Sequence, residues 1–178
     1  KDALDKEDPN VPMGFTRPGI KIRVTAAVKK VNRPDHNIIA ILPPGVETDN
    51  PEYVMIGAHY DHLGYNDGTI NPKGGNPGRI HNGADDNASG AAGPLAVARA
   101  FAEQDAGRRT LILIAFGGEE AGLVGSAHYV REPFIALEDT VAMVNLDMIG
   151  RLRDGKLVVF GIETSSSFPS LVGRAAEG

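Results

Sequence analysis

Apolar and polar residues follow two different patterns along this chain. Residues 20–31 alternate between apolar and polar side chains, which predicts a strand with one face in solvent. Residues 53–59 are rich in apolar residues and predict a strand, and residues 110–116 are a continuous apolar run, typical of a strand covered on both faces. Further strands are predicted over residues 37–42, 141–148 and 157–161.

Helical spacing of apolar residues predicts helices between these strands. Ala91, Leu95 and Ala98 form an apolar stripe in a helix expected over residues 89–104. Two more helices are expected over 119–132 and 165–176. Strands alternating with helices predict an α/β fold, with a mixed, mostly parallel β-sheet flanked by helices. We expect residues 1–19 to be a linker or domain-entry segment, and residues 20–178 to form one domain.

Composition limits the functions that remain open. The 178 residues carry a net charge of −5 without a cluster of Lys and Arg, so we expect no nucleic-acid partner. No apolar stretch reaches the ~20 residues of a membrane-spanning helix, so we expect no membrane insertion. The chain has no cysteine, so a metal site would have to use His, Asp and Glu.

Chemically active residues gather where predicted strands end. His59 ends the predicted strand 53–59 and Asp61 lies two residues further on, so on a strand the two would point to the same side. Asp61 could then accept a hydrogen bond from one ring nitrogen of His59 while the other nitrogen binds a metal ion. The alternative is a strand that ends in polar surface residues.

Three acidic segments stand at similar junctions. Asp85-Asp86 and Glu119-Glu120 each precede or begin a predicted helix, and Asp147 interrupts an apolar strand. Each could simply cap a helix or a turn. Together with His59, however, they would bring one imidazole and several carboxylates to one edge of the sheet. Such ligands suit zinc, manganese or cobalt.

Four strings in this order resemble the co-catalytic zinc exopeptidase family, which includes bacterial leucyl aminopeptidase, aminopeptidase Y and glutamate carboxypeptidase II. They are AHYDHLG, GADDNASG, FGGEEAGLVGS and NLDMIG, and the resemblance covers residues 37–174. It implies a zinc-dependent exopeptidase fold that hydrolyses a peptide substrate at a chain end, most simply as an aminopeptidase. It leaves carboxypeptidase and dipeptidase activity open.

The resemblance also implies roles for individual residues. The implied metal ligands are His59, Asp85, Glu120 and Asp147, with Asp85 bridging two zinc ions. Glu119 would be the general acid and base, and Asp61 would orient His59. A cis peptide bond is implied after the bridging aspartate, between Asp85 and Asp86.

The family's last metal ligand is a histidine near the C-terminus, which this chain is expected to lack. A complete site would hold two zinc ions, and this chain would hold one. His62 and His81 are interpreted as rim residues, and His128 as a packing or surface residue. The sequon Asn87-Ala88-Ser89 is interpreted as a coincidence.

Missing strands would leave a sheet edge open to another molecule, so a homo-oligomer is expected. The N-terminal segment resembles the part that follows a protease-associated domain in relatives, which implies an extracellular or periplasmic location.

Two other functions share the implied fold. One is a non-catalytic, receptor-like relative, which the filled positions of the acidic and histidine residues argue against. The other is a zinc acyltransferase of the glutaminyl cyclase type. Release of an amino acid, as opposed to cyclisation of an N-terminal glutamine, would distinguish that acyltransferase from a peptidase.

Overall fold

A computed structural model describes residues 18–29, 32–46, 49, 51–65, 78–104, 109–152 and 154–177. The chain divides into two compact units, Lys1–Arg33 and Pro34–Gly178. In the first unit, residues 18–29 are irregular and exposed, so the strand predicted over 20–31 is wrong wherever it can be compared. An alternating pattern becomes a strand only when a neighbour accepts its hydrogen bonds and covers its apolar face. Residues 30 and 31, and most of the predicted linker over 1–19, lie outside the described residues.

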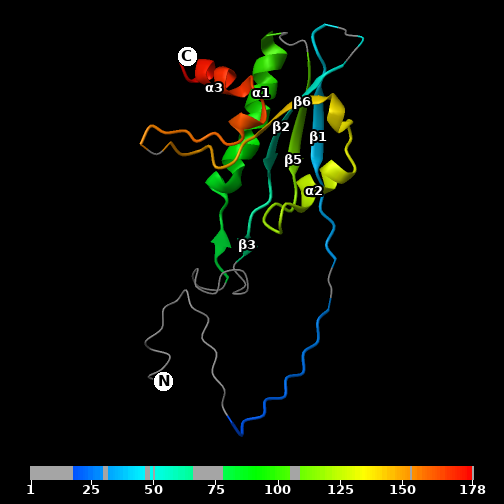
Figure 1. Cartoon of the computed structure of the whole chain (residues 1–178), viewed down its shortest axis with the longest axis vertical. Helices are drawn as coiled ribbons and strands as arrows, with labels where there is room; N and C mark the ends of the chain where they lie inside the picture. Colours follow the sequence, from blue (N-terminus) through cyan, green and yellow to red (C-terminus); the bar gives the residue numbers. More distant parts are fainter. Residues whose placement is uncertain are drawn as a thin grey trace. The chain divides into compact units, whose positions relative to one another are not determined.

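The second unit is built on a mixed sheet with the strand order β1-β5-β2-β6 (Figure 1). β2 runs parallel to both β5 and β6, and β1 runs antiparallel to β5 at one edge. The predicted mixed, mostly parallel sheet flanked by helices is therefore confirmed. The strands are β1 (Ile38–Leu42), β2 (Tyr53–His59), β3 (Gly64–Tyr65), β4 (Ile80–His81), β5 (Thr110–Phe116) and β6 (Thr140–Asn145).

Helices and helical turns connect the strands. α1 lies against β2 and β5, and Tyr129 of α2 is buried in the core of the sheet. The helices are α1 (Gly90–Gln104), α2 (Val124–Arg131) and α3 (Phe168–Ala176), and the shorter turns are η1 (Ala84–Ser89), η2 (Leu137–Asp139) and η3 (Ile162–Thr164). Among the described residues, none of these helices is both long and apolar enough to cross a membrane.

The core forms on the two central strands. Met55 of β2 packs with Ile112, Ile114 and Phe116 of β5 and with Tyr129, whose ring meets Phe116 edge to face at 6.4 Å. Residues at even positions of β5 share this face, and the odd-numbered leucines on the other face are buried as well. Both faces of β5 are therefore covered, as its continuous apolar run predicted.

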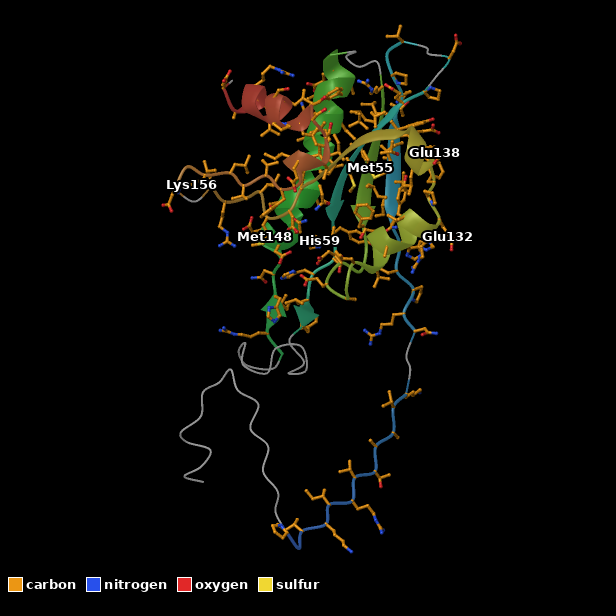
Figure 2. The ribbon with its side chains drawn as sticks, viewed as in Figure 1. Met55, His59, Glu132, Glu138, Met148 and Lys156 are labelled. Carbon is orange, nitrogen blue, oxygen red and sulfur yellow. The ribbon has the colours of Figure 1, made fainter. Side chains whose placement is uncertain are left out.

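The register of the sheet brings three strand ends together. His59 at the end of β2 pairs with Phe116 at the end of β5, and Gly57 pairs with Asn145 at the end of β6. The residues that follow these strands therefore meet at one edge of the sheet. In Figure 2, His59 and Met148 lie at this end, and Met55 lies further back along β2.

Three predicted elements differ from the structure. The helix expected from residue 119 begins only at Val124, because residues 119–123 form a turn. The strand predicted over 157–161 is wrong, because these residues are irregular and mostly exposed and none of the described strands pairs with them. The Gly-, Asn- and Pro-rich composition of residues 64–82 also predicts a long loop. Most of that loop lies outside the described residues, and its two ends pair as β3 and β4.

Candidate metal centre

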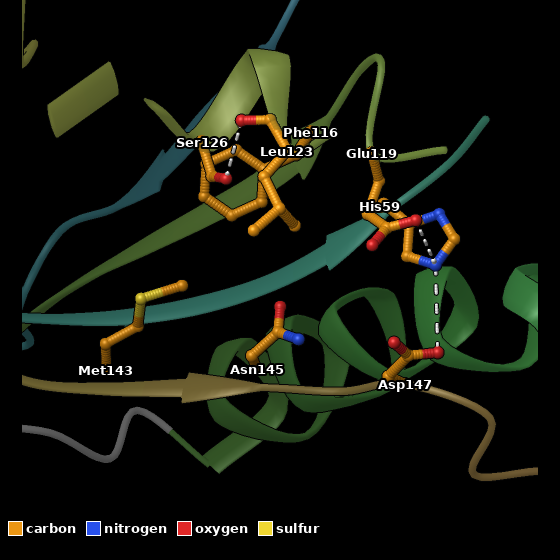
Figure 3. Close-up of a pocket in the computed structure, with 8 residues that line it drawn as sticks. All are labelled: His59, Phe116, Glu119, Leu123, Ser126, Met143, Asn145 and Asp147. Atoms are coloured by element: carbon orange, nitrogen blue, oxygen red, sulfur yellow. Dashed lines mark hydrogen bonds and ion pairs between the residues drawn. The ribbon is translucent and has the colours of Figure 1, made fainter. Parts of the chain in front are cut away.

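His59 is a deeply buried polar side chain at this edge of the sheet, with 4% of its surface exposed. Its Nδ1 lies 3.1 Å from the backbone carbonyl oxygen of Asp61. Its Nε2 lies 3.3 Å from Oδ1 of Asp86 and 3.7 Å from Oδ1 of Asp147. Figure 3 shows the ring facing Asp147 and Glu119. One ring nitrogen is therefore held by the backbone, and the other faces carboxylates.

Two overlapping groups of side chains have the composition of a metal site. The first contains His59, Asp86 and Asp147, and the second contains His62, Asp86 and Glu120. Within each group, one ligand atom of every residue lies within 4.8 Å of the others. Asp86 belongs to both groups. This arrangement can hold two cations that share one carboxylate.

The shared residue is Asp86, whereas the sequence prediction gave this role to Asp85. The Asp85 carboxylate lies outside both groups and accepts hydrogen bonds from Arg151 Nε at 2.6 Å and from the Gly150 amide at 3.0 Å. The bond from Arg151 is the main cause that lowers the pKa of Asp85, opposed by desolvation and supported by Gly150 and Ser89. Adjacent side chains leave this turn in different directions, so only one of the two carboxylates can face His59.

The cis peptide bond is also one residue later than predicted, between Asp86 and Asn87. The backbone is non-helical at both of these residues, which interrupts η1. The Asn87 side chain is 2% exposed, and it accepts hydrogen bonds from the Gly90 and Met148 amides and donates one to the Leu146 carbonyl. A side chain used in this way cannot carry a glycan in the folded chain, which agrees with the interpretation of the sequon as a coincidence.

Asp61 contacts different groups from those predicted. Its carboxylate lies 3.7 Å from His59 Nδ1, beyond hydrogen-bonding distance, and the Asp61 carbonyl oxygen orients the ring instead. The two carboxylate oxygens accept hydrogen bonds from the backbone amides of Glu119 at 3.0 Å and Glu120 at 3.2 Å. One side chain therefore fixes the backbone of both glutamates.

Glu119 lies beside the first group, with Oε2 4.0 Å from His59 Nε2. Burial raises the pKa of the Glu119 carboxyl; the charge of His59 opposes this shift, and the nearby carboxylates of Glu120, Asp147 and Asp61 reinforce it. A carboxylate whose pKa is raised accepts a proton more readily than a free carboxylate does, which suits a group that takes up a proton and later returns it.

A cavity of about 230 Å³ opens next to Glu119 and His59 (Figure 3). Its walls are mainly apolar, so an uncharged group could lie against the carboxylates there. The lining residues are His59, Phe116, Glu119, Leu123, Ser126, Met143, Asn145 and Asp147.

His62 is the site residue that sequence reasoning placed at the rim. Its Nδ1 lies 2.7 Å from Oε1 of Glu120 and 3.9 Å from Oδ1 of Asp86. Its partner Glu120 is 58 positions away in sequence, so local spacing gave no sign of the contact. Gly83 allows this approach: a Cβ atom there would lie 3.0 Å from the His62 side chain.

The site therefore offers two imidazoles and four carboxylates, counting Glu119, from segments that follow β2, β5 and β6 and from η1. Nitrogen and oxygen donors of this kind suit zinc and also other divalent transition metals.

The known proteins to which this chain is similar are peptidases. The family described as Peptidase family M28 matches residues 37–177. A "Probable zinc metalloprotease" of Pyrenophora tritici-repentis is 36% identical over 118 residues, which are 66% of this chain and 25% of the relative. "Aminopeptidase YwaD" of Bacillus subtilis is 33% identical over 120 residues, 67% of this chain and 23% of the relative.

"Leucine aminopeptidase 1" of Trichophyton rubrum is 32% identical over 162 residues, which are 86% of this chain and 39% of the relative. The chain thus spans about a quarter to two fifths of the length of these relatives. No solved structure gives a significant match.

Proposed function

The chain belongs to peptidase family M28, and from this membership we propose that it carries the metal centre of a zinc-dependent exopeptidase of the aminopeptidase type. One observation carries the proposal: two groups of metal-binding side chains share Asp86, and a further carboxylate, Glu119, stands beside them. The names of the relatives, a zinc metalloprotease and two aminopeptidases, support the metal and the reaction.

The residues fit zinc by their chemistry. His59, Asp86 and Asp147 would hold one ion, and His62, Asp86 and Glu120 would hold a second. Each set joins one imidazole to two carboxylates, and zinc accepts both kinds of ligand. When bound, zinc supplies a water of lowered pKa and positive charge for the carbonyl oxygen of the substrate.

The proton transfers are proposed for Glu119. Its carboxylate would take a proton from the water as the water oxygen attacks the scissile carbonyl carbon. It would then give this proton to the nitrogen of the departing amine as the C–N bond breaks. A base that takes up a proton and later returns it works best with a pKa above that of a free carboxyl group and near the working pH. Burial raises the pKa of Glu119 in this direction.

Asp61 and the backbone would hold this arrangement in place. The hydrogen bonds from the Glu119 and Glu120 amides to the Asp61 carboxylate fix the proposed base relative to the proposed ligand Glu120. The Asp61 carbonyl holds Nδ1 of His59 and leaves Nε2 directed at Asp86 and Asp147. Outer contacts of this kind set the tautomer and the direction of a histidine ligand.

The test combines zinc content with turnover. Glu119→Gln should keep the zinc content of the native protein and lose at least ~100-fold in turnover of a peptide with a free N-terminus. Elemental analysis after dialysis measures the first quantity, and release of the free amino acid measures the second. Substantial turnover by Glu119→Gln would refute the proposed base.

Three substrate tests separate the remaining activities. Cleavage of a free peptide but not of its N-acetylated form would support an aminopeptidase, whereas a need for a free C-terminus would support a carboxypeptidase. Cyclisation of a peptide with N-terminal glutamine, with release of ammonia, would support the acyltransferase instead.

A further inference from the structure

The two neighbours of Asp86 in sequence both bind the loop that carries Asp147. Asn87 donates from Nδ2 to the Leu146 carbonyl at 3.1 Å and accepts at Oδ1 from the Met148 amide at 3.1 Å. These contacts lie directly before and directly after Asp147. The Asn87 side chain is therefore attached to the backbone on both sides of a proposed ligand.

Asp85 makes a second attachment further along the same loop. Its Oδ1 accepts from the Gly150 amide at 3.0 Å, and its Oδ2 accepts from Arg151 Nε at 2.6 Å. Ser89 Oγ adds a contact to Asp85 Oδ1 at 3.2 Å from the other end of η1. The segment that presents Asp86 is thus tied to the loop at residues 146, 148, 150 and 151.

Three backbone features agree with this attachment. Met148 adopts φ 49°, a left-handed conformation that is uncommon for a residue with a side chain and persists where surrounding contacts impose it. A Cβ atom on Gly150 would lie 2.7 Å from Asp85 Oδ1. A Cβ atom on Gly90 would overlap Asn87 Oδ1 and the Leu146 carbonyl oxygen. Both glycines leave space for the contacts.

From these contacts we infer that Asp85, with Arg151, and Asn87 are positioning residues that set the separation of the Asp86 and Asp147 carboxylates before zinc binds. The inference rests on the proposed function, because it assumes that these two carboxylates are ligands of one ion. Carboxylates already held at a fixed separation lose little freedom when a cation binds. Outer contacts of metal ligands typically contribute 10–100-fold in metal affinity.

The chain contains a matched control for the exposed part of this network. Arg151 Nε pairs with Asp85 at 2.6 Å, and Arg109 Nε pairs with Glu52 at 2.7 Å. Both arginine side chains are more than half exposed, at 57% and 51%. Only the first pair touches the proposed site. Arg151→Gln and Arg109→Gln therefore remove the same kind of contact, with and without a link to the metal ligands.

The experiment measures zinc affinity by competition with a chromophoric chelator, on the full chain, for the native protein and for Arg151→Gln, Asp85→Asn and Arg109→Gln. We expect Arg151→Gln and Asp85→Asn to weaken zinc binding by ~10–100-fold, and Arg109→Gln to change it by less than ~2-fold. Urea unfolding in the presence of EDTA should give similar midpoints for the two arginine variants.

Three results would overturn the inference in different ways. If Arg151→Gln and Asp85→Asn both bind zinc as tightly as the native chain, the positioning role is wrong and the proposed function stands. If the native chain binds no zinc, the proposed function fails, and the inference that rests on it fails too. Weaker binding in Arg109→Gln as well would show a general effect of lost ion pairs, which also contradicts the positioning role.

Discussion

Replacing Gly90 by alanine should destabilise the fold, although the same change usually stabilises a helix. Gly90 begins α1 with φ −62° and ψ −43°, a conformation open to any residue, so the backbone itself does not oppose alanine. The obstacle is space. The new Cβ atom would overlap Asn87 Oδ1 and the Leu146 carbonyl oxygen and would lie 2.7 Å from Asn87 Cγ.

The size of the effect follows from these contacts. Overpacking against buried backbone costs about 1–3 kcal/mol. Displacing the Asn87 amide also breaks its hydrogen bonds to Leu146 and Met148, each worth about 1 kcal/mol net. The higher helix propensity of alanine returns about 1 kcal/mol. We therefore expect the free energy of unfolding to fall by about 2–4 kcal/mol.

Urea unfolding followed by far-UV circular dichroism measures this change. EDTA in all samples removes the contribution of bound metal to stability. Gly173→Ala in α3 is the control, because nothing lies within 4 Å of a Cβ atom at that position. It should gain up to about 1 kcal/mol. If Gly90→Ala is as stable as the native chain, the tight fit around Asn87 described above is incorrect.

Three other predictions concern single side chains. Asp61→Asn should reduce turnover by ~10-fold or more while zinc content is retained. The asparagine side chain has one oxygen, so it can accept a hydrogen bond from only one of the backbone amides of Glu119 and Glu120. Unchanged turnover would contradict a positioning role for Asp61. His62→Gln should lower the zinc content, measured by elemental analysis, by one ion per chain. The control is His81→Gln, which should not change the zinc content, although the ring centroids of His81 and His62 are only 6.3 Å apart. Two ions in both variants would exclude His62 as a ligand. Tyr129→Phe should raise the free energy of unfolding by ~1 kcal/mol in urea, because its buried hydroxyl finds no hydrogen-bond partner among the described residues; a clear loss of stability would reveal a partner.

Some of the fold could be predicted because the pattern allows few alternatives. Residues 53–59 are rich in apolar residues, and residues 110–116 form a continuous apolar run, which is typical of a strand covered on both faces. Both are central strands. The alternating residues 20–29 were a weaker guide, since alternation describes one apolar side of a strand but does not supply a partner for its backbone.

The candidate site was predictable by segment and less so by residue. The strand ends bring residues 59, 119 and 147 to one edge because parallel strands end together. The choice between Asp85 and Asp86 depended on the non-helical backbone inside η1, which a pair of identical neighbours does not reveal. His62 was underestimated because its contact with Glu120 depends on how distant loops fold back.

The order of the strands has a consequence for the chain while it is still on the ribosome. β2 is central, but both of its partners are made later: Tyr53 pairs with Thr110, and Gly57 pairs with Asn145. At ~5–20 residues per second, the wait is roughly 3–11 s for β5 and 4–18 s for β6. Throughout that interval an apolar strand has no neighbour of its own. We therefore expect the yield of folded protein to depend on the rate of elongation and on chaperones that bind nascent apolar segments. These factors should affect the yield more than the stability of the finished sheet does.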